Sequence, residues 1–437
     1  MKKEFPKLLI ADKNGTVFDV PFLEAAGMKG NKFFRLEPER MKKLHPDSEL
    51  FVLPERRPVG FDADFNRFVE IEEAPFTKKN VECYAVAAFI SPGQTVMYNT
   101  AYSEKKGANI LPLFSYAAVA FYKNEFYTAA FSIDREKRQE LAGMDHKSVE
   151  RNVKSFRKIF PENRLVRHLE RCALTYGCPA AKNFFLKKYE APLPTSPTCN
   201  AECVGCISKQ NKKGCSVTQP RIEFVPTPEE IAEIALFHIR AVKDPVVSFG
   251  QGCEGEPLMQ AKVLVEAIRE IRRSTGKGMV NLNTNASRPD VISGLFDAGL
   301  DSIRVSMNSV REKYYAAYYL PKGYRFNDVV RFIKRAKKKN GFVSINYLTM
   351  PGFTDSRKEA DALLSFLDRN SVDMIQWRNL NYDPLMYFKK LRINVKYEDT
   401  IGIDNVISMV KKEYPNIMHG YFNPSRGRIR RAKKRKI

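Results

Sequence analysis

From about residue 220 onward, hydrophobic positions alternate between two spacings. Short apolar runs such as PVVSF (245–249) and MVNLN (279–283) have the length and composition of buried strands. Each is followed by a longer stretch whose apolar residues recur every three or four positions, which predicts a helix with one buried face. Counting the stretch before Cys199, the sequence contains six strand–helix units, with the remaining strands in 301–307, 342–348 and 372–377. This alternation predicts a parallel sheet covered by helices.

Six units predict an α/β fold, a partial (β/α)6 barrel related to the eight-unit TIM barrel, in which chemistry takes place at the C-terminal ends of the strands. Helix starts are marked by capping residues. In TPEEIAEIALFHIRAV (227–242), Thr227 can cap the helix, Pro228 suits its first position and Glu230 completes a capping box. We expect the core to span 191–385 and a C-terminal helical segment to span 386–425.

Residues 1–150 have a different composition from the core. Segments such as KLLIADKNGTVFDV (7–20) and SYAAVAFYKNEFYTAAFSI (115–133) are rich in β-branched and aromatic residues and contain turn signals such as KNG. This part is expected to be a separate α+β or mainly β domain of unknown role. A helical connector (151–190) then leads to a proline-rich boundary, APLPTSP, before the core.

The balance of charged residues indicates which class of partner the protein binds. The 437 residues include 73 Lys and Arg against 50 Asp and Glu, a formal net charge of +23 that suits a polyanion, RNA above all. The basic tail (426–437) is expected to be a disordered solubilising segment or a nucleic-acid contact, with contact to membrane lipid as a third and weaker alternative. No run approaches the roughly 20 apolar residues of a membrane span and no signal peptide is evident, so we expect a cytoplasmic protein without a membrane partner.

Three cysteines lie within eight residues of PTSPTCNAECVGCISKQ (194–210), directly after the first predicted strand. Thiolates hold iron–sulfur clusters with four ligands as a rule, so three cysteines leave one iron open to another molecule. A zinc site made of Cys199, Cys203, Cys206 and Cys215 is the alternative, although zinc sites usually pair two ligand knuckles and the second is missing here. In a reducing cytoplasm, cysteines in such numbers are more typical of ligands or buried thiols than of disulfides.

The C-x3-C-x2-C spacing of Cys199, Cys203 and Cys206 resembles the signature of the radical S-adenosylmethionine (radical SAM) superfamily. The resemblance implies one 4Fe–4S cluster held by these cysteines, with SAM chelating the open iron through its amino and carboxylate groups. It also implies reductive cleavage of SAM to methionine and a 5′-deoxyadenosyl radical, with electrons from a donor such as flavodoxin or ferredoxin. Gly205 departs from the pattern, because the family often has an aromatic residue before the last cysteine.

A second segment, VVSFGQGCEGEPLMQ (246–260), resembles the Gly-Gly-Glu-Pro segment that binds the SAM amino group in this family. Gly255, Glu256 and Pro257 match it, whereas Glu254 stands in place of the first glycine. A glycine lets the backbone approach a ligand closely, and a carboxylate can accept hydrogen bonds from an ammonium group. A glycine-rich turn that caps a helix is the alternative interpretation.

Polar residues follow two further strands. Ser306 and Asn308, at the end of the fourth, resemble residues that hydrogen-bond the SAM ribose. Asn285 lies in NTNAS (283–287), where the family has a segment near the SAM carboxylate. Such residues also cap helices, so a structural role stays open. We expect Arg304 on the opposite strand face from Ser306 and Asn308, in a structural role, with pairing to the SAM carboxylate as the alternative.

Cys172, Cys178, Cys215 and Cys253 are not part of the triplet. Free cysteines are often buried thiols, but a second cluster or a catalytic thiol stays open for this group. After the sixth strand, QWRNLNYDP (376–384) places Trp377, Arg378 and Asn379 either around a substrate or in a loop with a buried indole.

Together these features predict a radical SAM enzyme, with RNA as the substrate class that the charge favours. Modification of a peptide or protein, including activation of a partner enzyme, is the alternative within the family. A non-catalytic iron–sulfur or zinc protein that binds nucleic acid is the alternative outside it. The sequence identifies no catalytic residue for the step that follows radical formation.

Overall fold

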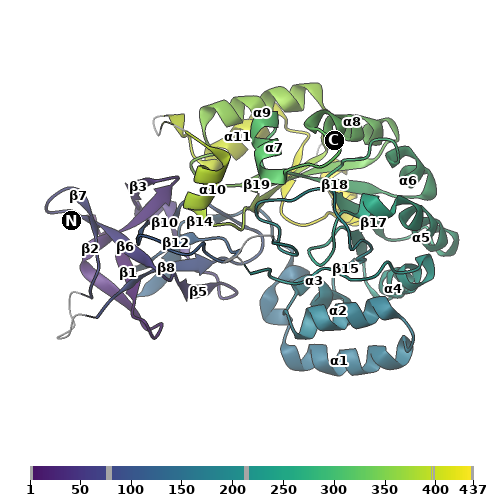
Figure 1. The fold of residues 1–437 in the computed structure, drawn as a ribbon, viewed down its shortest axis with the longest axis horizontal. Helices are drawn as coiled ribbons and strands as arrows, with labels where there is room; N and C mark the ends of the chain where they lie inside the picture. Colours follow the sequence, from purple (N-terminus) through teal and green to yellow (C-terminus); the bar gives the residue numbers. More distant parts are fainter. Residues whose placement is uncertain (1–2, 75–80, 211–215, 395, 397–398, 435–437) are drawn as a thin grey trace.

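The computed structural model describes residues 3–74, 81–210, 216–394, 396 and 399–434. Figure 1 shows two parts side by side, a β domain formed by the first third of the chain and a helix-covered barrel formed by the rest. The helical connector lies against the barrel, below it in this view. None of the described helices is both long and apolar enough to span a bilayer.

The N-terminal domain is mainly β, as the sequence predicted. Its large sheet is antiparallel and follows the order β11-β6-β2-β1-β8-β12-β13-β4, with β3, β5, β7 and β10 paired at its sides. The KNG turn joins the first two strands, and Asp12 Oδ1 accepts from the N–H groups of Asn14 and Thr16 at 2.8 and 2.9 Å. The strands are β1 (Lys7–Ala11), β2 (Val17–Lys29), β3 (Lys32–Arg35), β4 (Lys42–Lys43), β5 (Glu49–Val52), β6 (Arg56–Asp62), β7 (Arg67–Glu70), β8 (Tyr84–Phe89), β9 (Gln94–Val96), β10 (Asn99–Thr100), β11 (Tyr102–Glu104), β12 (Ala117–Tyr122), β13 (Glu125–Thr128) and β14 (Ala130–Ser132).

Three helices form the connector: α1 (His146–Ile159), α2 (Arg164–Leu174) and α3 (Pro179–Phe185). Asp145 caps α1 and Asn163 caps α2, each accepting from a backbone N–H of the first turn. The buried rings of Phe156 and Phe184 pack edge to face with centroids 5.0 Å apart. Phe156 also packs edge to face on Phe237 of the first barrel helix, again with centroids 5.0 Å apart, so the same aromatic cluster docks the connector on the barrel.

The second part is the predicted α/β fold, a curled parallel sheet with helices outside. Its strands follow chain order from β15 to β21, and every neighbouring pair is parallel. Six of them are the strands expected from the sequence, and β21 adds a seventh. The strands are β15 (Glu190–Pro192), β16 (Val246–Phe249), β17 (Met279–Thr284), β18 (Ser302–Met307), β19 (Phe342–Thr349), β20 (Met374–Asn379) and β21 (Met418–Gly420).

The first outer helix begins where the sequence marks it. Thr227 and Glu230 form the predicted capping box at the start of α4. The helices that follow β15 and its successors are α4 (Pro228–Ala241), α5 (Ala261–Ser274), α6 (Ile292–Ala298), α7 (Glu312–Tyr319), α8 (Phe326–Lys338), α9 (Arg357–Arg369), α10 (Pro384–Leu391) and α11 (Ile403–Glu413).

Asn423, just beyond the edge strand β21, links the opposite edge strand, β15, to β20. Its Nδ2 donates to Glu190 Oε1 on β15 at 2.7 Å, and its Oδ1 accepts from Gln376 Nε2 on β20 at 3.1 Å. The same amide lies 3.2 Å from Asn283 Oδ1. A buried, well-satisfied polar network of this kind holds a single arrangement of the strands.

The β domain docks on the loops and ends of β19 and β20. Asn379 at the end of β20 exchanges two hydrogen bonds with the backbone of β9, at Gln94 and Val96. A buried ion pair joins Lys29 Nζ to Asp355 Oδ2 at 2.9 Å. The β domain is thus a fixed wall beside the C-terminal ends of the barrel strands.

The basic tail is ordered over its described part, contrary to the disordered alternative. Residues Arg426–Lys434 form α12. Arg428 pairs with Asp134 at 2.8 Å and the Gly427 N–H donates to Asp244 at 2.9 Å. These acidic partners, distant in sequence, give the tail a docking site that its own composition could not reveal.

Candidate functional site

The cysteine loop is held in place by backbone hydrogen bonds to the end of α7. Glu202 and Val204 donate N–H groups to the carbonyls of Tyr319 and Tyr318, at 3.1 and 2.9 Å. Ala201 also forms an isolated β-bridge with Pro321. These contacts fix the cysteine loop against the end of α7. The three cysteines of the triplet therefore project from a rigid loop.

Cys199, Cys203 and Cys206 line one cavity together. Burial raises the pKa of Cys199 to about 11, and raises that of Cys203 well above its usual value. Burial acts in the same direction on Cys206, but hydrogen bonds with Ser208 and the nearby Arg221 guanidinium leave its pKa below the usual value. Arg221 Nη2 lies 3.5 Å from Cys206 Sγ. A cation at this position compensates negative charge gathered on the thiolates.

Gly205 has no room for the aromatic residue that the family often carries there. A Cβ at this position would lie 2.8 Å from the hydroxyl oxygen of Tyr318 on α7. Tyr318 is buried and its ring therefore fills the adjacent space. The hydroxyl end of a tyrosine on the neighbouring helix thus lies where a side chain at position 205 would begin.

The Gly255–Pro257 segment approaches the cysteine loop as closely as backbone permits. A Cβ on Gly255 would lie 2.0 Å from the Thr198 carbonyl oxygen, next to Cys199. Two backbone hydrogen bonds join the segments, from Gly255 N to Ser196 O at 2.6 Å and from Glu256 N to Thr198 O at 2.8 Å. Only glycine fits here, so the match to the sequence motif has a steric cause.

Glu256 is buried at the wall of the same cavity. Its carboxylate accepts from Thr284 Oγ1 at 2.5 Å and from the Asn285 N–H at 2.7 Å. Burial raises the pKa of Glu256 to about 7, against these hydrogen bonds. Pro257 begins a short 3-10 helix (Pro257–Gln260), at its first position. The sequence motif and the Asn285 segment are therefore joined into one unit.

Glu254, which replaces the first motif glycine, has a structural task of its own. One carboxylate oxygen accepts from the N–H groups of Thr195 and Ser196, and the other from those of Gly250 and Gln251. Burial raises the pKa of Glu254 to about 8, although four N–H donors favour its carboxylate form. This side chain ties the loop after β16 to the segment that leads into the cysteines.

Ser306 lines the cavity, and Arg304 lines it as well. The expectation that Arg304 faces away from Ser306 was wrong, because residues two apart on a strand share a face. Burial and the neighbouring Arg378 lower the pKa of Arg304 to about 9. Its Nε has no hydrogen-bond partner among the described residues.

Asn308 is not among the residues that line the cavity. It is fully buried, and its Nδ2 donates to the Tyr314 carbonyl at 3.2 Å and to the Tyr387 hydroxyl at 3.1 Å. Trp377 is buried too, with Nε1 donating to His419 Nδ1 at 2.9 Å. Both side chains support the walls, whereas Arg378, stacked on Tyr421, lies close enough to influence Arg304.

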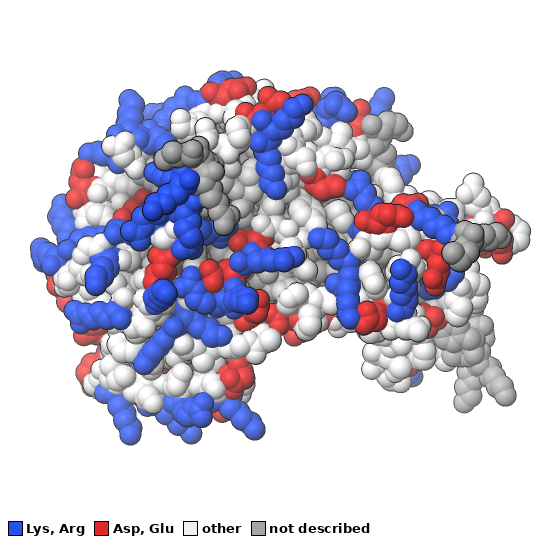
Figure 2. Space-filling model, turned by 180° about the vertical axis from the view of Figure 1, so that it is seen from behind, with Lys and Arg blue, Asp and Glu red and all other residues white. Residues whose placement is uncertain are grey.

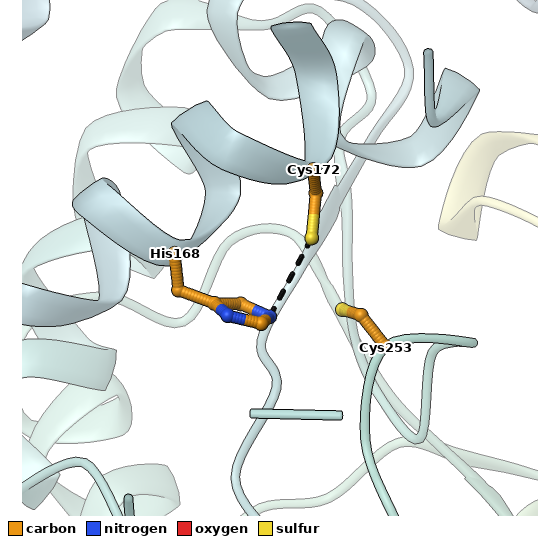
Figure 3. A group of neighbouring side chains, drawn as sticks. All are labelled: His168, Cys172 and Cys253. Atoms are coloured by element: carbon orange, nitrogen blue, oxygen red, sulfur yellow. Dashed lines mark hydrogen bonds between the residues drawn. The ribbon is translucent and has the colours of Figure 1, made fainter. Parts of the chain in front are cut away.

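Of the remaining cysteines Cys172, Cys178, Cys215 and Cys253, the structure brings only two into one group among the residues that it describes, and Cys178 is not in it. Cys215 lies outside the described residues, so the structure does not place it. Cys172 and Cys253 come together with His168, a residue that the sequence reading did not single out (Figure 3). The signal was present in the sequence, since His168 and Cys172 are four residues apart on one helix and therefore share a face.

Sequence comparison identifies part of the barrel. A sequence model of the family described as Radical SAM superfamily matches residues 193–364. The FeMo cofactor biosynthesis protein NifB of Klebsiella pneumoniae is 26% identical over 187 residues, which are 38% of this chain and 38% of that protein. The chain thus matches well under half the length of this curated relative.

Solved structures with a similar outline share little sequence. Streptococcus suis SuiB bound to S-adenosylmethionine is 15% identical, with 61% of this chain and 62% of that chain covered and a TM-score of 0.37. The FeFe-hydrogenase maturase HydG from Carboxydothermus hydrogenoformans is 14% identical, with coverages of 68% and 74% and a TM-score of 0.37.

Proposed function

We propose, from the premise that residues 193–364 make this chain a member of the radical SAM superfamily, that it is an enzyme that cleaves SAM reductively. The proposed site is the cavity at the C-terminal ends of the strands, lined by the cysteine triplet and by Glu256, Asn285 and Ser306. The proposed products are methionine and a 5′-deoxyadenosyl radical, which acts on a second substrate in the barrel.

The single observation that carries this proposal is the convergence of four separate segments on one cavity. The cysteine loop, the loop after β16, the end of β17 and the end of β18 all contribute to it. The residues suit a 4Fe–4S cluster and SAM. Three thiols leave one cluster iron unliganded by protein, and the glycine contact brings the second loop against the first. When bound, the reduced cluster supplies the electron that breaks the sulfur–carbon bond of SAM.

The chain's own groups would bind and orient SAM. Gly255 and Pro257 shape the backbone beside the cluster, and the Glu256 carboxylate holds the SAM amino group either directly or by fixing that backbone. Asn285 lies at the place proposed for the SAM carboxylate and Ser306 at the place proposed for its ribose. Asn308, on its Tyr387 contact, would position the end of β18 rather than touch SAM.

Arg304 and Arg378 support a negatively charged group on the second substrate. Arg304 lines the cavity, and burial and the neighbouring Arg378 lower its pKa, while the Glu190 carboxylate acts in the opposite direction. A cation enclosed by protein is costly without an anionic partner. An anion that enters from the cavity would lower that cost and be held next to SAM.

RNA is the proposed substrate class, because its phosphates supply such an anion and the whole chain carries a net charge of +23. Figure 2 shows Lys and Arg side chains over much of the barrel and connector seen from behind, with Asp and Glu scattered among them. A peptide or protein carboxylate is the alternative for the same reason. An electron donor such as flavodoxin or ferredoxin would approach the outer mouth beside the cysteines, where Lys209 and Lys322 lie.

Anaerobic assays of 5′-deoxyadenosine formation test the enzyme proposal. Reconstituted, reduced wild type is expected to form this nucleoside from SAM, and Cys199→Ala/Cys203→Ala/Cys206→Ala to form none. Cys83→Ala is the matched control, since Cys83 is buried in the β domain away from the cavity. Equal product from wild type and the triple variant would refute the proposal.

Salt dependence tests the RNA proposal. Each lost phosphate contact lowers the slope of log affinity against log salt by roughly 0.7–0.9. Neutralising Arg430, Arg431 and Lys433, which are exposed on α12, is expected to reduce the slope if this helix contacts RNA. An RNA affinity that is undetectable for wild type would favour the peptide or protein alternative.

A further inference from the structure

A group of three soft metal ligands lies outside the cavity described above. His168 and Cys172 are four residues apart on α2, so both project from one face of that helix toward the loop after β16 (Figure 3). Cys253 reaches the same point from that loop. Nε2 of His168 is 3.5 Å from Sγ of Cys172, and the three ligand atoms all lie within 4.8 Å of one another.

These separations suit one ion. Around a tetrahedral zinc ion with bonds of about 2.0–2.3 Å, two ligand atoms lie roughly 3.3–3.8 Å apart. The His168–Cys172 separation already falls in this range. A cluster distributes its cysteines over several irons, each with its own thiolate, and so requires wider spacing. Closing the group around one ion needs a shift of about 1 Å at most, because the widest separation allowed is 4.8 Å.

The chemistry of the three groups points the same way. Thiolate sulfur and imidazole nitrogen together are typical ligands of zinc. Cys172 and Cys253 are both buried and His168 is half-buried, so two thiolates here need a compensating charge. A divalent cation bound by two thiolates and one neutral imidazole gives a site of zero net charge. That is the combination that tolerates burial best.

We propose that His168, Cys172 and Cys253 bind a single zinc-type divalent ion, separate from the cysteine triplet. The fourth position is left to solvent or to a neighbouring group. Cys178 does not belong to the set, because its Sγ is not within the same range of all three ligand atoms. Cys253, Glu254 and Glu256 lie in one loop, so the ion fastens that loop to the connector helix α2.

The ion's task is structural, and the ion takes no part in the cleavage of SAM itself. Cys253 directly precedes Glu254, whose carboxylate binds the segment leading to the cysteine loop. The Cys253 carbonyl also accepts from the Ile222 N–H at 2.8 Å. A bond from the metal to Cys253 would therefore hold the loop at its side chain, in addition to the hydrogen bonds that already hold its backbone and Glu254. We expect loss of the ion to lower the unfolding temperature while leaving the cysteine triplet in place.

The experiment measures zinc, iron and acid-labile sulfide per chain in full-length protein. The background is Cys199→Ala/Cys203→Ala/Cys206→Ala, which removes the triplet's ligands and separates this test from that of SAM cleavage. The expected result is about one zinc per chain that survives dialysis against a weak chelator. Adding His168→Ala, Cys172→Ser or Cys253→Ser is expected to abolish it, whereas adding Cys178→Ser is expected to retain it.

A second readout guards against variants that fail to fold. Cobalt(II) substituted into the background protein is expected to show sulfur-to-cobalt charge-transfer absorption that disappears with Cys172→Ser but persists with Cys178→Ser. Iron with sulfide in place of zinc would overturn the proposal in favour of a second cluster. Metal-free protein with a Cys172–Cys253 disulfide, or with two free thiols that do not take up cobalt, would also overturn it. So would loss of metal in Cys178→Ser.

Discussion

Gly255→Ala is the substitution with the most specific consequence in this protein. Its Cβ would lie 2.0 Å from the Thr198 carbonyl oxygen and 2.5 Å from the Thr198 carbonyl carbon. Favourable contact between such atoms needs about 3.5 Å, so one of the two loops must move by more than about 1 Å. Thr198 is directly bonded to Cys199, so the movement is transmitted to the first cysteine of the triplet.

The size of the effect follows from the contacts that are broken. Crowding in a packed site costs about 1–3 kcal/mol. The two backbone hydrogen bonds between the loops, at 2.6 and 2.8 Å, contribute about 0.5–1.5 kcal/mol each. Unfolding free energy should therefore fall by roughly 1–3 kcal/mol if the loops stay together and the crowding remains. If they separate instead, the crowding is relieved, the two hydrogen bonds are lost at a total cost of about 1–3 kcal/mol, and the cysteine loop is displaced.

Urea unfolding and iron content after anaerobic reconstitution distinguish these cases. If the loops stay together, Gly255→Ala is expected to unfold at a lower urea concentration than wild type. If they separate, it is expected to retain less iron than wild type after reconstitution. Gly294→Ala is the matched control, because Gly294 is exposed in α6 and an added Cβ there meets nothing within 4 Å. It should stabilise by up to about 1 kcal/mol. Wild-type stability together with wild-type iron content in Gly255→Ala would refute the steric reasoning.

Three further substitutions probe the scaffold by urea unfolding. Lys29→Met leaves Asp355 buried without its cation and should lower the free energy of unfolding by about 3–5 kcal/mol. The double variant Lys29→Met/Asp355→Asn should recover most of this loss. A loss below about 1 kcal/mol in Lys29→Met would show that this ion pair does not hold the β domain. Burial lowers the pKa of His238 to about 4, so the unfolded state binds more protons between pH 4 and 6.5. Stability should therefore fall as pH decreases through this window, by up to about 3 kcal/mol, and His238→Gln should flatten the profile whereas His146→Gln, at an exposed helix position, should not. Asn423→Ala removes one of the two donors to Glu190 and the acceptor of the buried Gln376 Nε2, and should cost about 3 kcal/mol; unchanged stability would argue against its role in closing the barrel.

The barrel could be predicted from sequence because its signals are local. Apolar runs, capping boxes and terminal glycines each fix one strand or helix, as Thr227 and Glu230 do for α4. The seventh strand was missed because β21 has only three residues and is defined by its pairing with β20. The order of α12 was missed for a related reason. Its partners Asp134, Asp244 and Asp301 are far away in sequence.

In the candidate site, too, residues in short local motifs were predicted, whereas residues defined by distant partners were not. Gly255 and Glu256 were predicted from a short motif, and the structure adds the steric reason for the glycine. Asn423 could not be found in advance, since an asparagine beyond a three-residue strand has no distinguishing pattern. Arg304 was assigned to the wrong strand face, an error that the two-residue repeat could have corrected. His168 was overlooked because its partner Cys253 comes from another element.

The most direct test of the central claim is electron paramagnetic resonance of anaerobically reconstituted, dithionite-reduced protein with and without SAM. A cluster with one open iron predicts a signal that changes when SAM is added and that is absent from Cys199→Ala/Cys203→Ala/Cys206→Ala. Glu256→Gln is expected to keep the signal but to need more SAM for the same change. A cluster signal that SAM leaves unaltered in wild type, or that survives in the triple variant unchanged, would contradict the assignment of this cavity as the SAM site.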